Sequence, residues 1–166
     1  MKLSSCHHTE LAPEIEPEFI ERKWEIETPD KAINISGRID IQESKAKRRR
    51  IRETKTRVAA PPKGMENDMD QLSMYSLASK VLDGEVAPIT VDWVVATKTK
   101  TYPVSRETTR DHKDWTPLLW RIENAVKGIQ SGVFQPAHRS SWWCGPLYCG
   151  YWDICPSVNN KRSYFV

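Results

Sequence analysis

Residues 33–56 have the sequence INISGRIDIQESKAKRRRIRETKT. In the first nine, isoleucine or glycine alternates with a polar side chain, which is the period-two pattern of a strand with one apolar face. The last nine, 48–56, predict a second and strongly charged strand, and a polar loop over 42–47 joins the two. Because this connection is too short for a crossover helix, the two strands are expected to pair as an antiparallel hairpin.

The patterns on either side of this hairpin predict an α/β (α+β) domain with a mixed central sheet flanked by helices. Asn67 or Asp68 is expected to cap the first long helix, and Asp83-Gly84 to end it. The order of elements alternates strands with helices rather than separating them. The further predicted elements are strands at 17–28, 89–97 and 101–108, and helices at 69–82 and 115–129.

Three segments divide the chain in this prediction: an N-terminal segment at 1–16, a core at 17–131 and a Cys- and Trp-rich tail at 132–166. The first is expected to be irregular because Pro13 and Pro17 exclude a regular helix there. No regular element is expected in the tail. Pro29-Asp30 predicts a turn, and residues 59–64 predict a mobile linker.

The composition is that of one soluble globular domain, with 166 residues, 39% hydrophobic and 28% charged. No apolar run approaches the roughly 18 residues that cross a bilayer, so no membrane partner is expected. The first 18 residues contain no apolar signal region, which predicts a cytoplasmic location, the host cytoplasm for a viral protein. In that reducing compartment the four cysteines are expected to bind a metal or cluster rather than form disulfides.

Positive charge is concentrated in one segment, although the net charge is only +3. Eight basic residues lie between positions 45 and 57, against the single acid Glu53. Such a field suits a polyanion such as DNA, because neutralised phosphates release condensed counterions. The alternative is a solvated basic hairpin with no ligand. The phosphate contacts are expected from Arg48, Arg49, Arg50 and Arg52.

Three polar residues of the hairpin can form a catalytic site. Asp40 lies near the end of its strand, while Glu53 and Lys55 are two positions apart and therefore project to the same face. Two carboxylates and a backbone carbonyl, that of Thr54, form a hard-oxygen site suited to Mg²⁺ or Mn²⁺. A lysine beside them can orient a water molecule or offset charge on a phosphate. The alternative is a set of exposed charges on an ordinary hairpin.

Three motifs in order, GRID at 37–40, IRETKT at 51–56 and QLSMY at 71–75, resemble the RecB-type branch of the PD-(D/E)XK nucleases. The resemblance implies a restriction-endonuclease-like core. It implies that Asp40 and Glu53 bind metal and that Lys55 assists the attacking water. It also implies that Gln71 and Tyr75, which share a helix face, contact the metal shell or the DNA.

The chain departs from this family at its start. Family members begin with a helix that carries another acidic residue, and the expected irregular N-terminus would lack it. Glu16 and Glu21 are the candidates to replace that acid.

The tail contains Cys144, Cys149 and Cys155 with C-x4-C-x5-C spacing. It resembles the end of phage-encoded RecB-like nucleases and the iron–sulfur nucleases of CRISPR adaptation. That resemblance implies a [4Fe–4S] cluster with Cys6 as the fourth ligand. One alternative is Zn²⁺ bound by the three cysteines with His138, His7 or His8. The other is three free thiols packed among tryptophans.

Together these features predict a divalent-metal-dependent DNA nuclease, an exonuclease of recombination, repair or phage DNA metabolism. One alternative is a non-catalytic DNA-binding module with a metal-stapled tail. A second is a degenerate nuclease fold that serves as a protein-interaction subunit. The chain contains no G-x-x-x-x-G-K-[ST] motif, so any helicase motor would be a partner. Homo-oligomerisation stays open.

Overall fold

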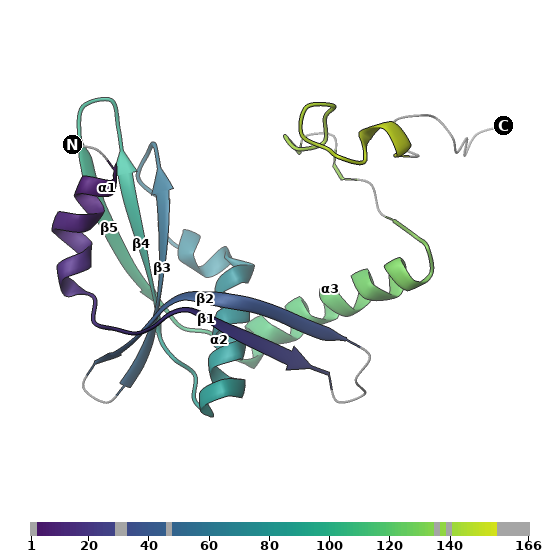
Figure 1. Ribbon diagram of the computed structural model, residues 1–166, viewed down its shortest axis with the longest axis horizontal. Coiled ribbons are helices and arrows are strands. Elements are labelled where there is room, and N and C mark those ends of the chain that lie inside the picture. The colour runs from purple at the N-terminus through teal and green to yellow at the C-terminus, as the bar shows by residue number, and fades with distance from the viewer. Residues whose placement is uncertain (1–2, 29–32, 46–47, 135–136, 139–140, 156–166) are drawn as a thin grey trace. The chain divides into compact units, whose positions relative to one another are not determined.

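The computed structural model describes residues 3–28, 33–45, 48–134, 137–138 and 141–155 (Figure 1). The predicted Pro29-Asp30 turn lies outside the described residues. The chain forms two compact units, residues 1–123 and 124–166. Helix α3 (His112–Gln130) contributes to both, so this division falls inside the helix and not at the expected boundary between 131 and 132.

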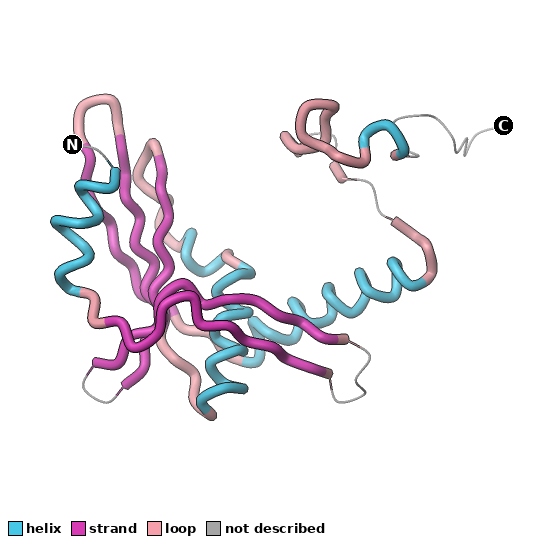
Figure 2. Tube along the Cα trace, in the orientation of Figure 1, coloured by secondary structure: helices cyan, strands magenta, loops and turns pink. Residues whose placement is uncertain are grey.

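A five-stranded mixed sheet in the order β1-β2-β3-β4-β5 forms the first unit (Figure 2). All neighbouring strands are antiparallel except β3 and β4, which are parallel and joined through helix α2 (Asp70–Asp83). This confirms the predicted fold class. The strands are β1 (Pro17–Glu27), β2 (Asn34–Lys45), β3 (Arg48–Arg57), β4 (Ile89–Ala96) and β5 (Thr101–Thr108).

The main core lies between α2 and one face of the sheet. Strand β4 is almost wholly buried, and Val91, Trp93 and Val95 alternate onto this face, as the pleat of a strand requires. Leu72 of α2 packs against them. On the opposite face Val94 contacts a smaller cluster with Cys6 and Leu11. A strand covered on both faces explains why residues 89–95 are rich in β-branched side chains.

The N-terminal segment is helical, so the prediction of irregular structure for 1–16 was wrong. It consists of α1 (Leu3–Cys6), a π-helical turn (His7–Leu11) and a 3₁₀ turn (Ala12–Glu14). Pro13 lies in the first turn of the 3₁₀ segment, where its missing N–H is not needed. Pro17 comes later and begins β1. The chain therefore has a helical segment ahead of the first strand, which the sequence was expected to lack.

The β1–β2 hairpin bends away from the rest of the sheet (Figure 1). The β2–β3 register runs only from Ile41 to Lys45, while β2 continues to pair with β1 as far as Asn34. At the bend, Glu21 of β1 adopts a left-handed backbone conformation with φ of 52°. The predicted loop at 42–47 is strand as far as Lys45. It is strand because Gln42 is buried and paired with β3.

Helix ends also differ from the predictions. Neither Asn67 nor Asp68 caps α2: its N-cap is Met69, which makes no side-chain cap hydrogen bond. Helix α3 begins at 112 and not at 115, because Asp111 accepts a hydrogen bond from the Lys113 N–H at 2.7 Å and so caps the earlier turn. Short 3₁₀ turns occur at Met65–Asp68 and in the tail at Trp152–Ile154, where no regular element was expected.

No helix within the described ranges combines the length and apolarity needed to cross a bilayer.

Candidate active site

Two carboxyl groups meet where β2 separates from β3. Glu53 projects from β3 toward α2, and its side chain is only 1% exposed. Asp40 lies one residue beyond the last β2–β3 pair, at the bend, and is half-buried. Asp40 is near enough to act on the pKa of the Glu53 carboxyl. The antiparallel hairpin therefore places them together, as the strand pattern predicted.

A ring of side chains, joined by polar contacts from Glu53 round to Asp40, connects these acids to Lys55, Gln71 and Tyr75. Lys55 forms an ion pair with Glu53 and donates to Gln71 Oε1 at 2.9 Å. Gln71 Nε2 donates to the Tyr75 hydroxyl at 2.6 Å, and that hydroxyl donates to Asp40 Oδ1 at 3.3 Å. The Lys55 side chain is 35% exposed, so the ring is open to solvent at this corner. All five residues singled out from the sequence lie together.

The electrostatics of the ring favour the binding of a cation. Burial raises the pKa of Glu53 to about 7; Lys55 lowers it, while the adjacent Asp40 raises it further. Burial also raises the pKa of Tyr75, and the charges of Glu53 and Asp40 act in the same direction. Tyr75 is therefore a neutral donor at neutral pH. Two acids this close disfavour double ionisation unless a positive charge joins them.

The donor set fits a hard divalent ion. Glu53 Oε2 is buried and has no hydrogen-bond partner, so one carboxylate oxygen lacks the polar contact that its burial requires. Within the described ranges, no three His, Cys, Asp or Glu side chains converge on one point. Asp40 and Glu53 thus supply two carboxylates, and the Thr54 carbonyl is adjacent in sequence. Mg²⁺ commonly binds one or two carboxylates and completes its shell with water and substrate oxygens.

A second polar network holds the other end of α2. Asp83, the last residue of the helix, accepts hydrogen bonds from Arg22 of β1, Gln42 of β2 and Arg49 of β3. Burial would raise the pKa of Asp83, but the hydrogen bonds from Arg22 and Gln42 and the charges of Arg22 and Arg49 lower it. This network ties three strands to the helix that carries Gln71 and Tyr75.

The prediction that Arg52 contacts DNA does not fit its environment, since the residue is only 8% exposed. On the sheet face opposite α2, Arg52 contacts Glu43 at 3.2 Å and Asp92 at 2.7 Å. Asp92 also accepts a hydrogen bond from Ser105. The charge of Arg52 is neutralised inside the protein, and we correct the prediction for this residue.

The neighbouring arginines differ in how strongly they are paired. Arg49 contacts Glu18 at 3.1 Å in addition to Asp83, and Arg50 pairs with Glu107 of β5. Arg48 is exposed. Acids distant in the sequence therefore offset much of the positive charge of 48–52. Among the four arginines, Arg48 fits the predicted phosphate contact best.

The cysteines do not form a metal site in the described part of the chain. Cys144, Cys149 and Cys155 are half-buried free thiols, and no group of three metal-binding side chains includes them. Cys6 packs with Leu11 in the apolar cluster behind β4, and burial raises the pKa of its thiol. This environment disfavours the thiolate that a metal ligand must supply. No group of three such ligands is present among the described residues, and the [4Fe–4S] and Zn²⁺ sites stay predictions.

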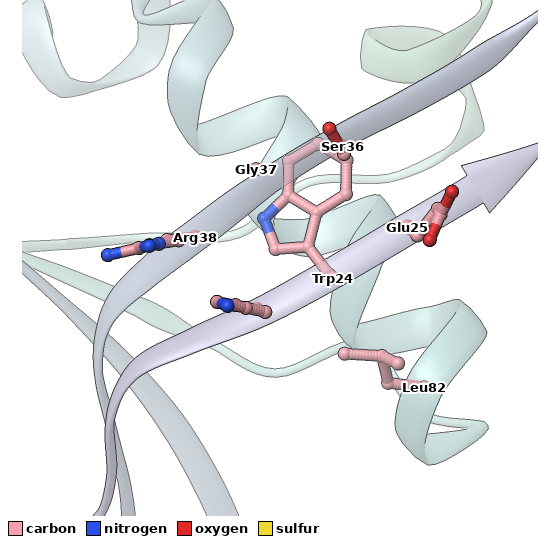
Figure 3. Close-up of a pocket in the computed structure, with 7 residues that line it drawn as sticks. Trp24, Glu25, Ser36, Gly37, Arg38 and Leu82 are labelled. Carbon is pink, nitrogen blue, oxygen red and sulfur yellow. The ribbon is translucent and has the colours of Figure 1, made fainter.

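A shallow pocket on the bent hairpin lies apart from the ring (Figure 3). The Trp24 indole extends across the hairpin and lies against Gly37 of β2. Leu82 at the end of α2 also lines this pocket, but none of the five ring residues does. The residues that line this pocket therefore belong to the packing of the hairpin and not to the candidate active site.

Sequence reasoning missed the charged residues that hold the elements around the ring. The sequence pattern predicts only a helix end at Asp83, and no motif marks Arg106 or Arg110. Asp92 offered a signal, because a lone acid within an apolar strand needs a buried partner. Arg110, at 5% exposure, gave no such signal, since it follows a predicted strand in a polar segment.

Comparisons with known proteins give a family and a fold for this chain. The family model described as the PD-(D/E)XK nuclease superfamily matches residues 4–156. The crystal structure of SSO0001 is similar, with a TM-score of 0.52 and 20% identity over 84% of this chain and 61% of that one. A Eubacterium rectale protein described as a candidate exonuclease has a TM-score of 0.55 and 13% identity, over 99% of this chain and 59% of that one. The chain thus spans about 60% of the length of both. A search of curated proteins found no match.

Proposed function

Because the chain belongs to the PD-(D/E)XK nuclease superfamily, we propose that it hydrolyses phosphodiester bonds in DNA with the help of Mg²⁺ or Mn²⁺. The observation that carries this proposal is the ring of Asp40, Glu53, Lys55, Gln71 and Tyr75. Strands β2 and β3 and the helix α2 that follows them converge to form it. Exposed charges on an ordinary hairpin would have no reason to do so.

Asp40, Glu53 and the Thr54 carbonyl would hold the divalent ion. When bound, such an ion lowers the pKa of a coordinated water and offsets charge on the phosphate. Lys55 orients the attacking water and stabilises the negative charge that develops on the phosphoryl oxygens. A new bond forms between the water oxygen and phosphorus, the ester P–O bond breaks, and the leaving oxygen takes up a proton. Gln71 fixes the Lys55 ammonium, and Tyr75 orients Asp40.

We further propose that cleavage is exonucleolytic and that it serves recombination, repair or phage DNA metabolism. The description of the Eubacterium rectale protein supports the exonuclease assignment. A helicase partner and a homo-oligomer belong to the same proposal. Linear and covalently closed circular DNA separate the two modes of cleavage, because only an endonuclease cuts the circle.

The decisive experiment compares metal-dependent cleavage by the wild type, Lys55→Ala and Glu53→Gln. Labelled linear single- and double-stranded DNA is incubated with Mg²⁺, Mn²⁺ or chelator. We expect cleavage by the wild type only with metal, and a loss of roughly 10²- to 10³-fold in either variant, since each removes charge stabilisation from the transition state. Lys113→Ala, which changes an exposed lysine at the start of α3, is the matched control and should keep full activity.

Two outcomes would contradict the proposal. Cleavage that persists in both variants would place the activity elsewhere or in a contaminant. Tight, salt-sensitive DNA binding by the wild type without any product would favour a DNA-binding module in place of an enzyme.

The metal or cluster in the cysteine tail stays a prediction from resemblance. Iron, zinc and sulfide analysis of protein purified without air tests it. A protein that contains none of these would contradict both the [4Fe–4S] and the Zn²⁺ assignment and leave free thiols.

A further inference from the structure

The start of helix α2 determines where Gln71 lies, because Gln71 is the second residue of that helix. The first four N–H groups of a helix have no partner within the helix, and a capping side chain normally holds this turn. Here Met69 provides no side-chain cap. Asn67, which could have capped the helix, instead accepts a hydrogen bond from Thr108 at 2.9 Å. Something other than a cap must therefore fix the first turn.

Arg106 of β5 binds the segment that leads into α2. Its guanidinium donates to the carbonyls of Pro61, at 2.8 Å, and Pro62, and contacts Glu66 Oε2 at 3.2 Å. The same group lies over the Trp93 ring, 5.6 Å from its centroid. The predicted mobile linker at 59–64 is thus tied to β5, an edge strand of the sheet. This segment connects the strand of Glu53 and Lys55 to the helix of Gln71 and Tyr75.

Arg110 contacts the helix itself. It is 5% exposed and donates to Ser73 Oγ of α2 at 3.1 Å, to the Glu66 carbonyl and to the Thr109 carbonyl at 3.0 Å. None of its contacts among the described residues is to a carboxylate. Burying a guanidinium without an acid is costly, so its fork of donors serves to fix geometry and not to neutralise charge.

We propose that Arg106 and Arg110 are positioning residues that set the first turn of α2 and hold Gln71 against Lys55. The proposal rests on the nuclease function proposed above. Ser73 is the direct link, because it lies two residues after Gln71 in the same turn and accepts from Arg110. A displacement of Gln71 would release the Lys55 ammonium from its 2.9 Å hydrogen bond.

Ser73→Ala tests this link without removing a buried cation, and Arg110→Lys tests the fork of donors itself. We expect either variant to lower kcat roughly 10- to 100-fold with little change in KM, as is typical when the partner of an active-site group is lost. Ser79→Ala is the matched control. Ser79 is also a buried serine of α2, and it donates to the Glu85 carbonyl at 3.1 Å, but it lies at the far end of the helix. That variant should keep the wild-type kcat.

A double-mutant comparison separates positioning from general destabilisation. If Ser73 acts through Gln71, Ser73→Ala will lower kcat in the wild type but not further in Gln71→Ala. An equal loss in both backgrounds would overturn the proposal.

A second readout does not depend on activity. Amide hydrogen exchange in peptides covering 65–74 should become faster in Ser73→Ala but not in Ser79→Ala. Unchanged exchange would overturn the inference even if the wild type cleaves DNA. Faster exchange in a protein that does not cleave DNA would confirm that Arg110 and Ser73 hold the first turn of α2, and would reject only the proposed function.

Discussion

At the scale of single residues, the candidate site depends on side chains that each make two contacts. Lys55 contacts Glu53 and Gln71, and Tyr75 accepts from Gln71 while donating to Asp40. Such mutual contacts fix the rotamers of the ring before any ligand arrives, which is how preorganised sites avoid reorganisation during the reaction. Within the ring, Glu53 Oε2 is the buried atom without a hydrogen-bond partner, and a cation would satisfy it.

Gly37, the first residue of the GRID motif, has a packing role that can be tested. A Cβ at this position would lie 2.4 Å from Trp24 Cζ2, well inside van der Waals contact with a buried ring. We expect Gly37→Ala to lower the free energy of unfolding by about 1–3 kcal/mol, because overpacking forces the indole or the backbone to move. Urea unfolding followed by tryptophan fluorescence measures this. Gly145→Ala, where no atom lies within 4 Å, is the control. Equal stability of the two variants would show that the glycine is not required for Trp24.

The five ring residues could be found from the sequence because their chemistry depends on spacing along regular elements. Glu53 and Lys55 share a strand face, and Gln71 and Tyr75 share a helix face, so local periodicity is enough. Residues such as Arg110 could not be found this way. Its role comes from a carbonyl 44 positions away, and no local pattern encodes that distance.

At the scale of elements, strands were easier to predict than the ends of helices. The bounds of β5 match the strand predicted at 101–108, whereas α1 and its continuation were missed because two prolines suggested irregular structure. Proline is tolerated in a first turn, so its presence alone does not exclude a helix. The cap of α2 was wrong for a related reason. Asn67 has two potential partners, and tertiary contact with Thr108 prevailed over local capping.

Asp83 joins the end of α2 to three strands, and this contact predicts a pH-dependent stability. Because the folded pKa of Asp83 is lowered, its contribution is present above the unfolded value of about 3.9 and is lost as pH falls through the folded value. The groups that face it are Arg22, Gln42 and Arg49. We expect Asp83→Asn to cost about 1–3 kcal/mol at pH 7. The difference from the wild type should shrink below about pH 4. Urea unfolding at both pH values measures it, and a difference that does not change with pH would contradict the ion-pair explanation.

At the scale of the whole molecule, charge in the sequence and charge in space differ. The segment 45–57 contains a single acid, yet folding brings Glu18, Glu43, Asp83, Asp92 and Glu107 into contact with its arginines. Counting charges along the chain therefore overestimated the field that DNA would encounter. The order of strands in the sheet decides which distant residues meet. The sequence predicted a mixed sheet but not this order.

Arg52 is neutralised inside the protein while Arg48 is exposed, so substitutions of the two should have different effects on stability and on DNA binding. Arg52→Met should cost about 3–5 kcal/mol of stability, because Glu43 and Asp92 would stay buried without their cation. Arg48 is exposed, so Arg48→Ala should leave stability within about 0.5 kcal/mol of the wild type. If the chain binds DNA as proposed, Arg48→Ala should reduce the slope of log K against log salt concentration by about one.

The measurements are urea unfolding for stability and DNA titrations at several salt concentrations for binding. Folded Arg52→Met should bind DNA with the wild-type salt dependence, because its charge is already compensated inside the protein. A reduced slope in Arg52→Met with unchanged stability would mean that Arg52 faces the nucleic acid, and that the buried network does not form in solution.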